Sequence, residues 1–491
     1  MHYCDNQLSE DCPLTKDKTS KYKCFNCCKG GLKLIVCCFT LLTLSITATL
    51  VFQLLYSNNT TQIRRNHHGA VATDYTNCSQ IGTKILRYGG NAVDAAIAAT
   101  ICMTVVAPHK TGLGGGGYIM IYNHKDQTNP IIIDFATNTN EGTFASINER
   151  IPAVLRGLEF ALILHGKLSW KEVISPSAKL AREGFIVSKE LADEISKNSD
   201  FALLYGHLNP GEMLRLEELA NTLDELAEYG TNVFYNGSLS KKVLYRDTVN
   251  AQLLKELAAY EPLVYTAHED SFYGYTIYYP QSAENLYRAL AELKHLNFVT
   301  NNASEVHSQF VLAETLINTN PISSILKQTA EEEKYTGVMA MDWQDTYVAA
   351  LTGLSTSLGS GYITEAGFLL DKGNNNNFST FTPIIFKSKK SICGLRGIFG
   401  SDNNVLNVQI LYNLLIQKMN VSTSIEYPRY YLLPDGMTVE HDHSIKPTEL
   451  NIPISHIDAI TISKSVNVII KTRDSMTSHS DSRGGGIASR F

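Results

Sequence analysis

The stretch from Gly89 to Gly117 constrains the fold of this chain more than any other. Small residues dominate it, and five of its last six residues are glycine. Residues without a Cβ atom let another segment of backbone approach closely and tolerate positive φ angles. Asn91 can cap a helix that follows it, and that helix has almost no polar face, so it must be buried. The stretch therefore predicts a buried helix and a close-packed turn that leads into a core strand.

Apolar spacing predicts the elements around this stretch. Helical periodicity, with Gly and Pro at the ends, indicates helices at 79–88, 153–166, 170–184 and 214–229. Apolar runs indicate strands at 71–73, 118–122, 131–135, 338–341, 347–351 and 383–386. Because strands lie on both sides of a helical block, we expect an α/β sandwich whose sheets come from distant parts of the chain.

An apolar run without charge, Leu34 to Tyr56, lies near the N-terminus. As a helix its 23 residues would extend roughly 34 Å, enough to cross a bilayer. It starts late for a signal peptide, and nothing upstream could cover it as a buried core helix. Six lysines precede the run, whereas Arg64 and Arg65 follow it, which favours a cytoplasmic N-terminus. We predict a single-pass type II protein of the plasma membrane, with a tail at 1–33, a membrane helix at 34–56, a stalk at 57–67 and an extracellular domain at 68–491.

The net charge and the positions of the cysteines limit the binding partners and modifications that the sequence allows. The net charge of −6 provides no basic field for nucleic acid. Cys78 and Cys102 could form a disulfide in an oxidising compartment. Cys24, Cys27 and Cys28 beside the membrane are candidates for palmitoylation, with a zinc site or plain reduced thiols as alternatives. Glycosylation triplets also suit an extracellular domain, and they occur at Asn58, Asn59, Asn77, Asn236, Asn302, Asn377 and Asn420.

No cofactor or metal site is predicted. The glycines of 112–117 lead into a strand, whereas a phosphate loop or a dinucleotide loop opens a helix and follows a different spacing. His67-His68 and His441-Asp442-His443 suit solvated loops better than ligand sets.

Several motifs together resemble the γ-glutamyltransferase family, also called glutathione hydrolases. They lie at 68–72, 85–95, 108–117, 166–170, 181–185, 359–361 and 481–486. The similarity runs from about residue 67 to the C-terminus and is stronger in the first half. It implies an N-terminal-nucleophile hydrolase fold, a four-layer α/β/β/α sandwich, behind a type II anchor. It also implies that Cys78 and Cys102 pair as they do in animal members.

The resemblance further implies a mechanism. In that family a precursor cuts itself before a threonine, and the new N-terminal amine serves as base for the threonine's own hydroxyl. The substrate is glutathione or another γ-glutamyl compound. An ungapped count places Tyr335 at the nucleophile position, and one deletion places Thr336 there. The division would separate a large-subunit-like part at 68–335 from a small-subunit-like part at 336–491.

Positions that would hold the γ-glutamyl group depart from the family pattern. Ala136 stands where an arginine would clamp the substrate's α-carboxylate, which removes charge-assisted hydrogen bonds. Gly353 and Ser355 replace a Thr-x-Asn pattern. Asp371 is the one carboxylate in the segment 371–377 that could meet the α-amino group.

Two further pairs of residues match the family pattern more closely. Ser379-Thr380 corresponds to a Ser-Ser pair that binds substrate in the family. Gly400-Ser401 corresponds to the Gly-Gly pair of the oxyanion hole, where any residue except proline supplies a backbone N–H.

The departures concentrate on one site, whereas the scaffold motifs remain. We therefore predict a family member with an eroded active site, an uncleaved chain and a binding or regulatory role. Its partner would be another membrane protein, such as an active paralogue. The alternative is an active glutathione hydrolase or γ-glutamyl transferase that uses Thr336 after self-cleavage.

Overall fold

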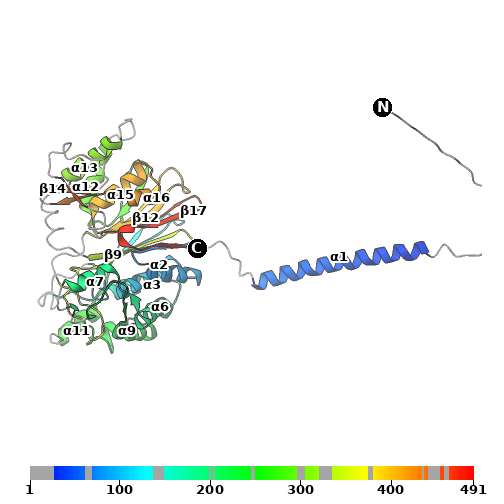
Figure 1. Ribbon diagram of the computed structural model, residues 1–491, viewed down its shortest axis with the longest axis horizontal. Coiled ribbons are helices and arrows are strands. Elements are labelled where there is room, and N and C mark those ends of the chain that lie inside the picture. The colour runs from blue at the N-terminus through cyan, green and yellow to red at the C-terminus, as the bar shows by residue number, and fades with distance from the viewer. Residues whose placement is uncertain are drawn as a thin grey trace, which may run out of the picture. The chain divides into compact units, whose positions relative to one another are not determined.

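A computed structural model describes most of the chain in two units. The described residues are 27–60, 69–136, 149–197, 201–202, 205–244, 249–295, 305–319, 334–373, 380–433, 436–440, 454–457 and 464–491. Contacts divide the chain into Met1–Asn66 and His67–Phe491. The first unit contains helix α1, Cys27–Thr60 (Figure 1). Its segment Ile35–Phe52, which lies inside the predicted run, is long and apolar enough to cross a membrane.

The second unit is built on two large β-sheets. The first sheet has the strand order β18-β1-β9-β10-β2-β3-β6, and the second has the order β17-β16-β12-β11-β8-β7. The strands of the first sheet are β1 Ala70–Ala72, β2 Gly116–Asn123, β3 Ile131–Asp134, β6 Leu263–Thr266, β9 Lys334–Met341, β10 Thr346–Leu354 and β18 Ala488–Arg490. Those of the second are β7 His268–Phe272, β8 Tyr275–Tyr279, β11 Thr382–Ser388, β12 Arg396–Ser401, β16 Asn467–Thr472 and β17 Ser475–Ser480. Each sheet therefore combines strands from distant parts of the chain, and all six predicted strands are present.

Helices cover the outer face of each sheet (Figure 1). The first sheet carries α2 Thr76–Arg87, α3 Ala92–Val106, α5 Val154–His165, α6 Trp170–Glu183, α7 Lys189–Ser196, α9 Glu217–Tyr229, α10 Asn232–Asn236 and α11 Ala251–Ala259. The second carries α12 Glu284–His295, α13 Glu305–Thr319, α15 Asn404–Leu411 with a π-helical continuation to Ile416, and α16 Val421–Glu426. Two smaller sheets are formed by β4 Phe185–Ile186 with β5 Met213–Leu214, and by β13 Tyr430–Leu433, β14 Gly436–Glu440 and β15 Ile454–Ile457.

Strand alternation explains the layering. Successive side chains of a strand point to opposite faces of its sheet. On β10, Val348 and Ala350 belong to the core under the helices, whereas Ala349 and Leu351 belong to the core between the sheets. On β11, Ile384 faces the helices on the other side and Ile385 faces the inter-sheet core. The protein therefore has the predicted four-layer α/β/β/α architecture.

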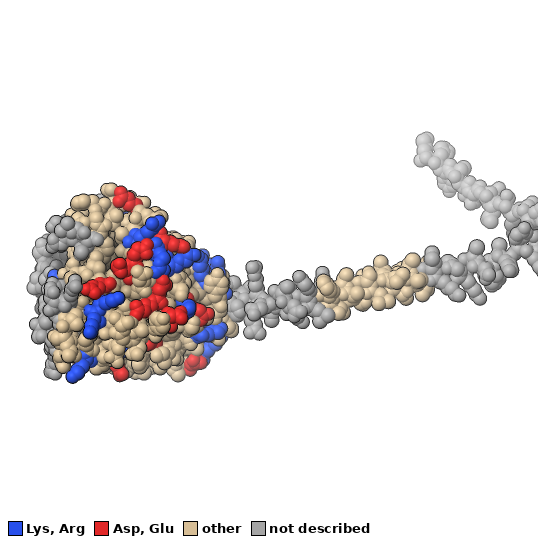
Figure 2. Space-filling view, turned by 90° about the horizontal axis from the view of Figure 1, so that it is seen from below, with Lys and Arg blue, Asp and Glu red and all other residues tan. Residues whose placement is uncertain are grey.

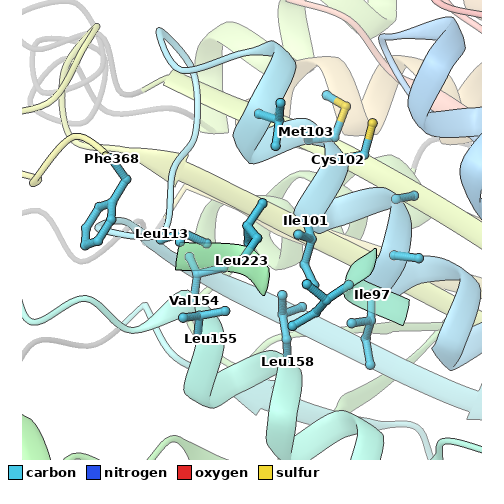
Figure 3. Close-up of a cluster of buried hydrophobic side chains, with 14 of the residues drawn as sticks. Ile97, Ile101, Cys102, Met103, Leu113, Val154, Leu155, Leu158, Leu223 and Phe368 are labelled. Carbon is cyan, nitrogen blue, oxygen red and sulfur yellow. The ribbon is translucent and has the colours of Figure 1, made fainter. Parts of the chain in front are cut away.

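Helix α3 is the centre of the first helical layer. All of its residues are buried, as the sequence predicts. Asn91 accepts hydrogen bonds from Val93 N and Asp94 N, and Asp94 accepts one from Asn91 N, which completes a capping box. Figure 3 shows Ile97 and Ile101 of α3 among apolar side chains of α5, including Leu158. The predicted disulfide is present.

That disulfide joins Cys78 of α2 to Cys102 of α3, with the two Cα atoms 5.3 Å apart. It therefore ties the first two helices of the layer together next to the buried face of α3.

The glycine-rich turn after α3 lies against β10 at backbone contact distance. A Cβ atom added to Gly115 would lie 2.0 Å from the carbonyl oxygen of Gly353. A Cβ atom added to Gly353 would in turn lie 2.1 Å from the carbonyl oxygen of Lys334 on β9. Side chains are therefore excluded at both positions, which confirms the predicted close-packed turn between a buried helix and a core strand.

Several predicted boundaries differ from the structure: the helix expected at 79–88 begins at Thr76, the strand expected at 338–341 begins at Lys334, and one further difference has a clear cause in strand pairing. The helix expected at 214–229 begins at Glu217, because Met213 and Leu214 form β5 and Leu214 pairs with Phe185 of β4. Leu214 is buried in the strand, and an apolar residue at its position also fits the helical spacing, so the spacing alone could not distinguish the two.

Charged side chains of both signs are interspersed on the surface. Figure 2 shows this mixture on the face seen from below the view of Figure 1. On that face no single-sign patch stands out among the described residues.

Candidate active site

Strand β9 carries both candidate nucleophile positions. Tyr335 pairs with Gly353 of β10, and Thr336 pairs with Thr352. The side chains of Tyr335 and Thr336 are both buried. Because β9 runs from Lys334 to Met341, the peptide bond between Tyr335 and Thr336 lies inside the ladder of strand pairing.

The hydroxyl of Thr336 contacts other hydroxyl groups. Its Oγ1 lies 3.3 Å from Thr352 Oγ1 and 3.5 Å from the carbonyl oxygen of Thr352. Thr352 Oγ1 accepts a hydrogen bond of 2.9 Å from Thr111 Oγ1. Within the described part of the chain, no basic side chain is among the hydrogen-bond partners of Thr336. A base for this hydroxyl would have to be the α-amine that cleavage before Thr336 creates.

Tyr335 is held in place at both ends of its side chain. Its hydroxyl donates a hydrogen bond to the carbonyl oxygen of Ser465, and its ring centroid lies 5.8 Å from that of Phe381. Burial raises the pKa of Tyr335 well above its ordinary value, and the nearby carboxylates of Asp402 and Asp74 raise it further. The phenol therefore stays neutral and is engaged in structural contacts.

Asp371 is the centre of a buried polar cluster. Its carboxylate accepts hydrogen bonds from Ser355 N at 2.9 Å, Ser355 Oγ at 2.6 Å and Lys372 N at 3.0 Å. Arg150 Nε lies 3.3 Å from Asp371 Oδ2. Burial raises the pKa of Asp371 to about 6, and the Arg150 charge and the Ser355 hydrogen bonds oppose that shift. Ser355 and Asp371, which the sequence analysis named separately, are in direct contact.

Arg150 is the residue that sequence reasoning missed. Its guanidinium is almost completely buried, and its Nη1 donates a hydrogen bond of 2.7 Å to the carbonyl oxygen of Ala136. Ala136 is the position at which the family resemblance led us to expect a carboxylate-binding arginine. Arg150, near the start of the described segment 149–197, thus contacts the backbone just after the end of β3. The available signal was a single cation directly before the apolar run Ile151–Leu155.

The remaining candidate residues lie around β11 and β12. Gly400 and Ser401 are inside β12, where Gly400 pairs with Pro383 of β11 and with Asn467 of β16. The hydroxyl of Ser401 donates to Asn407 Oδ1 at 2.9 Å, on α15. Thr380 directly precedes Phe381, whose ring contacts Tyr335. Ser379 lies outside the described residues.

A resident metal ion has no evident ligands in the described residues, because no group of three or more His, Cys, Asp or Glu side chains is clustered there. The candidate site therefore contains hydroxyl groups, the buried Arg150–Asp371 ion pair and backbone N–H and C=O groups.

The four-layer fold places the protein in the class of N-terminal-nucleophile hydrolase folds. The structure of cephalosporin acylase from Bacillus halodurans is similar, with a TM-score of 0.71 over 87% of this chain and 96% of that chain, at 16% sequence identity. At this level of identity the likeness concerns the fold.

Sequence comparisons identify the family. Residues 78–318 match the family described as Gamma-glutamyltranspeptidase. Glutathione hydrolase 2 of Arabidopsis thaliana is 38% identical over 196 residues, which are 35% of this chain and 34% of that protein. Glutathione hydrolase 7 of Mus musculus is 34% identical over 234 residues, which are 43% of this chain and 34% of that protein. The chain belongs to the gamma-glutamyltranspeptidase family, and its matches span about a third of the length of these curated relatives.

Proposed function

We propose that this protein is a membrane-anchored member of the gamma-glutamyltranspeptidase family that retains the fold, does not turn over γ-glutamyl compounds and acts through binding. One observation carries the proposal: the carboxylate of Asp371 is buried and already engaged by groups of the protein itself. A carboxylate has about four acceptor sites. Ser355 N, Ser355 Oγ and Lys372 N all donate to Oδ1, Ser355 N also donates to Oδ2 at 3.1 Å, and Arg150 Nε lies 3.3 Å from Oδ2 as an ion pair. A substrate α-amino group would have to compete with these donors and with the Arg150 charge for the carboxylate.

Displacing the groups that now contact Asp371 would require a large free energy. A substrate amine would have to displace Arg150, whose guanidinium also donates to Ala136 O. Separating one partner of a buried ion pair costs about 3–5 kcal/mol, because it leaves an uncompensated charge. The family's carboxylate clamp is also replaced by Ala136, so no compensating contact is gained at the other end of the substrate.

The candidate nucleophile is similarly confined. Thr336 becomes competent only if its own hydroxyl attacks the carbonyl carbon of Tyr335 and the chain is cut there. Pairing of Tyr335 with Gly353 and of Thr336 with Thr352 holds that peptide extended. Oxyanion stabilisation by Gly400-Ser401 is also disfavoured, since both residues take part in strand pairing and the Ser401 hydroxyl is directed to Asn407.

The proposal includes a location and a domain plan. We infer a tail at 1–33, a membrane helix at 34–56, a stalk at 57–67 and an outward domain at 68–491, in type II orientation at the plasma membrane. Three glycosylation triplets in the described residues have exposed asparagines, namely Asn77, Asn236 and Asn420. An outward domain without turnover would bind another membrane protein, such as an active family member.

Glutathione hydrolysis by Thr336 is the second candidate function. The observation that favours it is the second hydroxyl, that of Thr352, 3.3 Å from Thr336 Oγ1. A hydroxyl at this distance could orient the nucleophile after cleavage.

A turnover assay separates the two candidates. The full-length chain is purified in detergent and incubated with a γ-glutamyl anilide, with a glutathione hydrolase as positive control and Thr336→Ala as matched variant. We expect the wild-type chain to release no more amine than Thr336→Ala does. Release that is abolished by Thr336→Ala would establish the second candidate and remove the proposal.

A further inference from the structure

Four turns at one end of the two large sheets are joined by hydrogen bonds. His124 N, after β2, donates to Asp345 O, after β9, at 3.0 Å. His124 Nε2 lies 2.7 Å from Ile392 O, in the turn after β11. Arg473 N, after β16, donates to Cys393 O at 2.9 Å. We call this surface the turn face, and it consists of residues 124–130, 342–345, 389–395 and 473–474.

The turn face exposes two large apolar side chains. Trp343 is 41% exposed and Ile392 is 59% exposed. The Nζ of Lys125 lies 5.4 Å from the centroid of the Trp343 ring, so the cation and the ring belong to one amphipathic surface. Tryptophan is favoured at membrane interfaces, because its ring is apolar and its N–H group is polar.

The turn face also has an excess of exposed positive charge. Its exposed carboxylates are Asp126 and Asp474, and its exposed cations are more numerous, namely Lys125, Lys389, Lys390 and Arg473. The buried carboxylate of Asp345 in the same turns is neutralised inside the protein by Arg396 and Lys471. Lysine and arginine form charge-assisted hydrogen bonds with phosphate oxygens, so this surface is complementary to phospholipid headgroups.

The chain enters the domain at the same end. Ala70 of β1 pairs with Met341, the last residue of β9 before the turn that carries Trp343. Twelve residues, 57–68, separate the predicted membrane helix from Gly69. Even when fully extended, twelve residues span at most roughly 40 Å. A tether of this length would hold the turn face near the bilayer at a high effective concentration.

The loop after α2 adds an aromatic side chain beside this entry point. Phe491 N donates to Gly69 O at 3.2 Å, and the guanidinium of Arg87 lies 5.5 Å from the centroid of the Phe491 ring. Tyr88, next to Arg87, is 81% exposed. The end at which the chain enters therefore combines exposed aromatic and basic side chains beyond the turn face itself.

We propose that the turn face docks on a phospholipid surface, with Trp343 and Ile392 at the level of the headgroups and the exposed cations against lipid phosphates. The exposed tryptophan, the positive charge and the tether at the same end favour lipid over a protein as the occupant. None of the exposed glycosylation triplets, at Asn77, Asn236 and Asn420, lies in the turn face, so a glycan on them would not project from it. This inference rests on the membrane anchor proposed above and is independent of the proposed loss of turnover.

Tryptophan fluorescence in vesicles tests the proposal, because the chain has two tryptophans, Trp170 and Trp343. The full-length protein is reconstituted into phosphatidylcholine vesicles whose acyl chains carry bromine near the headgroup, which quenches a ring in contact with them. Trp170→Phe leaves Trp343 as the reporter. Trp343→Phe leaves Trp170, which packs against the core under the helices, as the matched control. Relative to unbrominated vesicles, we expect Trp343 to lose more than about half of its emission, as a ring at the interface would, and Trp170 to lose much less.

Charge reversal at two exposed lysines tests the role of the cations. Lys389→Glu, Lys390→Glu in the Trp170→Phe background should reduce the quenching of Trp343 at least about twofold, because both lose their contact with phosphate and repel it. Lys241→Glu, Lys242→Glu, at another adjacent exposed pair after α10, is the matched control and should leave the quenching unchanged.

Flotation of the same vesicles after an alkaline carbonate wash distinguishes this proposal from the anchor. If the protein floats but bromination does not change the emission of Trp343, or if the two lysine pairs have equal effects, lipid docking is overturned in favour of a protein partner on the turn face. Protein that does not float overturns the anchor, and this proposal with it.

Discussion

The guanidinium of Arg150 lies 3.3 Å from the carboxylate of Asp371, and both side chains are almost completely buried. Their main chains are also joined, since Arg150 N donates to Asp371 O at 3.2 Å. The neighbouring residues Glu149 and Lys372 form an isolated antiparallel bridge. The ion pair therefore belongs to a fixed junction between two distant segments. In the function proposed above, it occupies the position where a γ-glutamyl substrate would bind.

Removal of Arg150 should destabilise the protein strongly. Arg150→Met leaves the Asp371 carboxylate buried without its cation, which we expect to lower the free energy of unfolding by about 3–5 kcal/mol. The double variant Arg150→Met, Asp371→Asn removes both charges and should recover part of that loss. The measurement is urea unfolding of the full chain in detergent.

The control for this prediction is an exposed ion pair. Arg182 Nη1 lies 2.6 Å from Asp224 Oδ2, with both side chains well exposed. Arg182→Met should therefore cost less than about 1 kcal/mol. Equal effects of Arg150→Met and Arg182→Met would contradict a buried structural role for the Arg150–Asp371 pair.

Alanine substitutions at Gly115 and Gly112, which lie in the same turn, allow a matched comparison. The Cβ atom of an alanine at 115 would meet Gly353 O at 2.0 Å, whereas at 112 the nearest atom is Leu369 O at 3.8 Å. Gly115→Ala must push the turn away from β10, so we expect a loss of about 3 kcal/mol, at the upper end of overpacking. Gly112→Ala should change stability by less than about 1 kcal/mol. Thermal unfolding of the two variants side by side measures the difference, and similar midpoints would refute the close backbone contact.

The disulfide should contribute measurably to stability. Cys78 and Cys102 are 24 residues apart in sequence, and closing a loop of that size stabilises a protein by about 3 kcal/mol in the chain-entropy treatment. Cys78→Ala, Cys102→Ala should lower the free energy of unfolding by about 2–4 kcal/mol. Cys393→Ala, at an exposed free thiol, serves as control and should be neutral. The prediction is wrong if the double variant unfolds at the same urea concentration as the control.

His109 should make stability depend on pH. It is 1% exposed, and burial lowers the pKa of its imidazole, opposed by Glu190. As the pH falls below about 6.5, the unfolded chain takes up a proton that the folded protein excludes, so stability is full above that pH and decreases below it. The loss is up to about 1.4 kcal/mol per pH unit. The difference in unfolding free energy between wild type and His109→Leu, measured from pH 7.5 to 5, should shrink by this slope. Parallel curves would show that His109 does not titrate in this way.

The sequence predicted the scaffold well where local patterns and packing agree. Asn91 identified the start of α3 because a helix cap is a local signal, and the apolar run in β10 identified a strand. Leu214 was assigned to a helix because its partner Phe185 is distant in sequence, so no local pattern shows their pairing.

The site was harder to predict for the same reason. Ala136, Ser355 and Asp371 could be named from the family resemblance, but the residue that joins them could not. Arg150 contacts Ala136 O and Asp371 across a fold-dependent junction, and its own neighbours in sequence indicate only the start of an apolar helix. That contact became visible only with the structure.

The most direct test of an uncleaved, non-catalytic chain is the mass of the denatured polypeptide after purification from membranes and removal of glycans. We predict one species that contains the bond between Tyr335 and Thr336, with the mass of the intact chain. Two fragments, of which the C-terminal one begins at Thr336 and disappears in Thr336→Ala, would contradict the account and show that the protein processes itself as an active family member would.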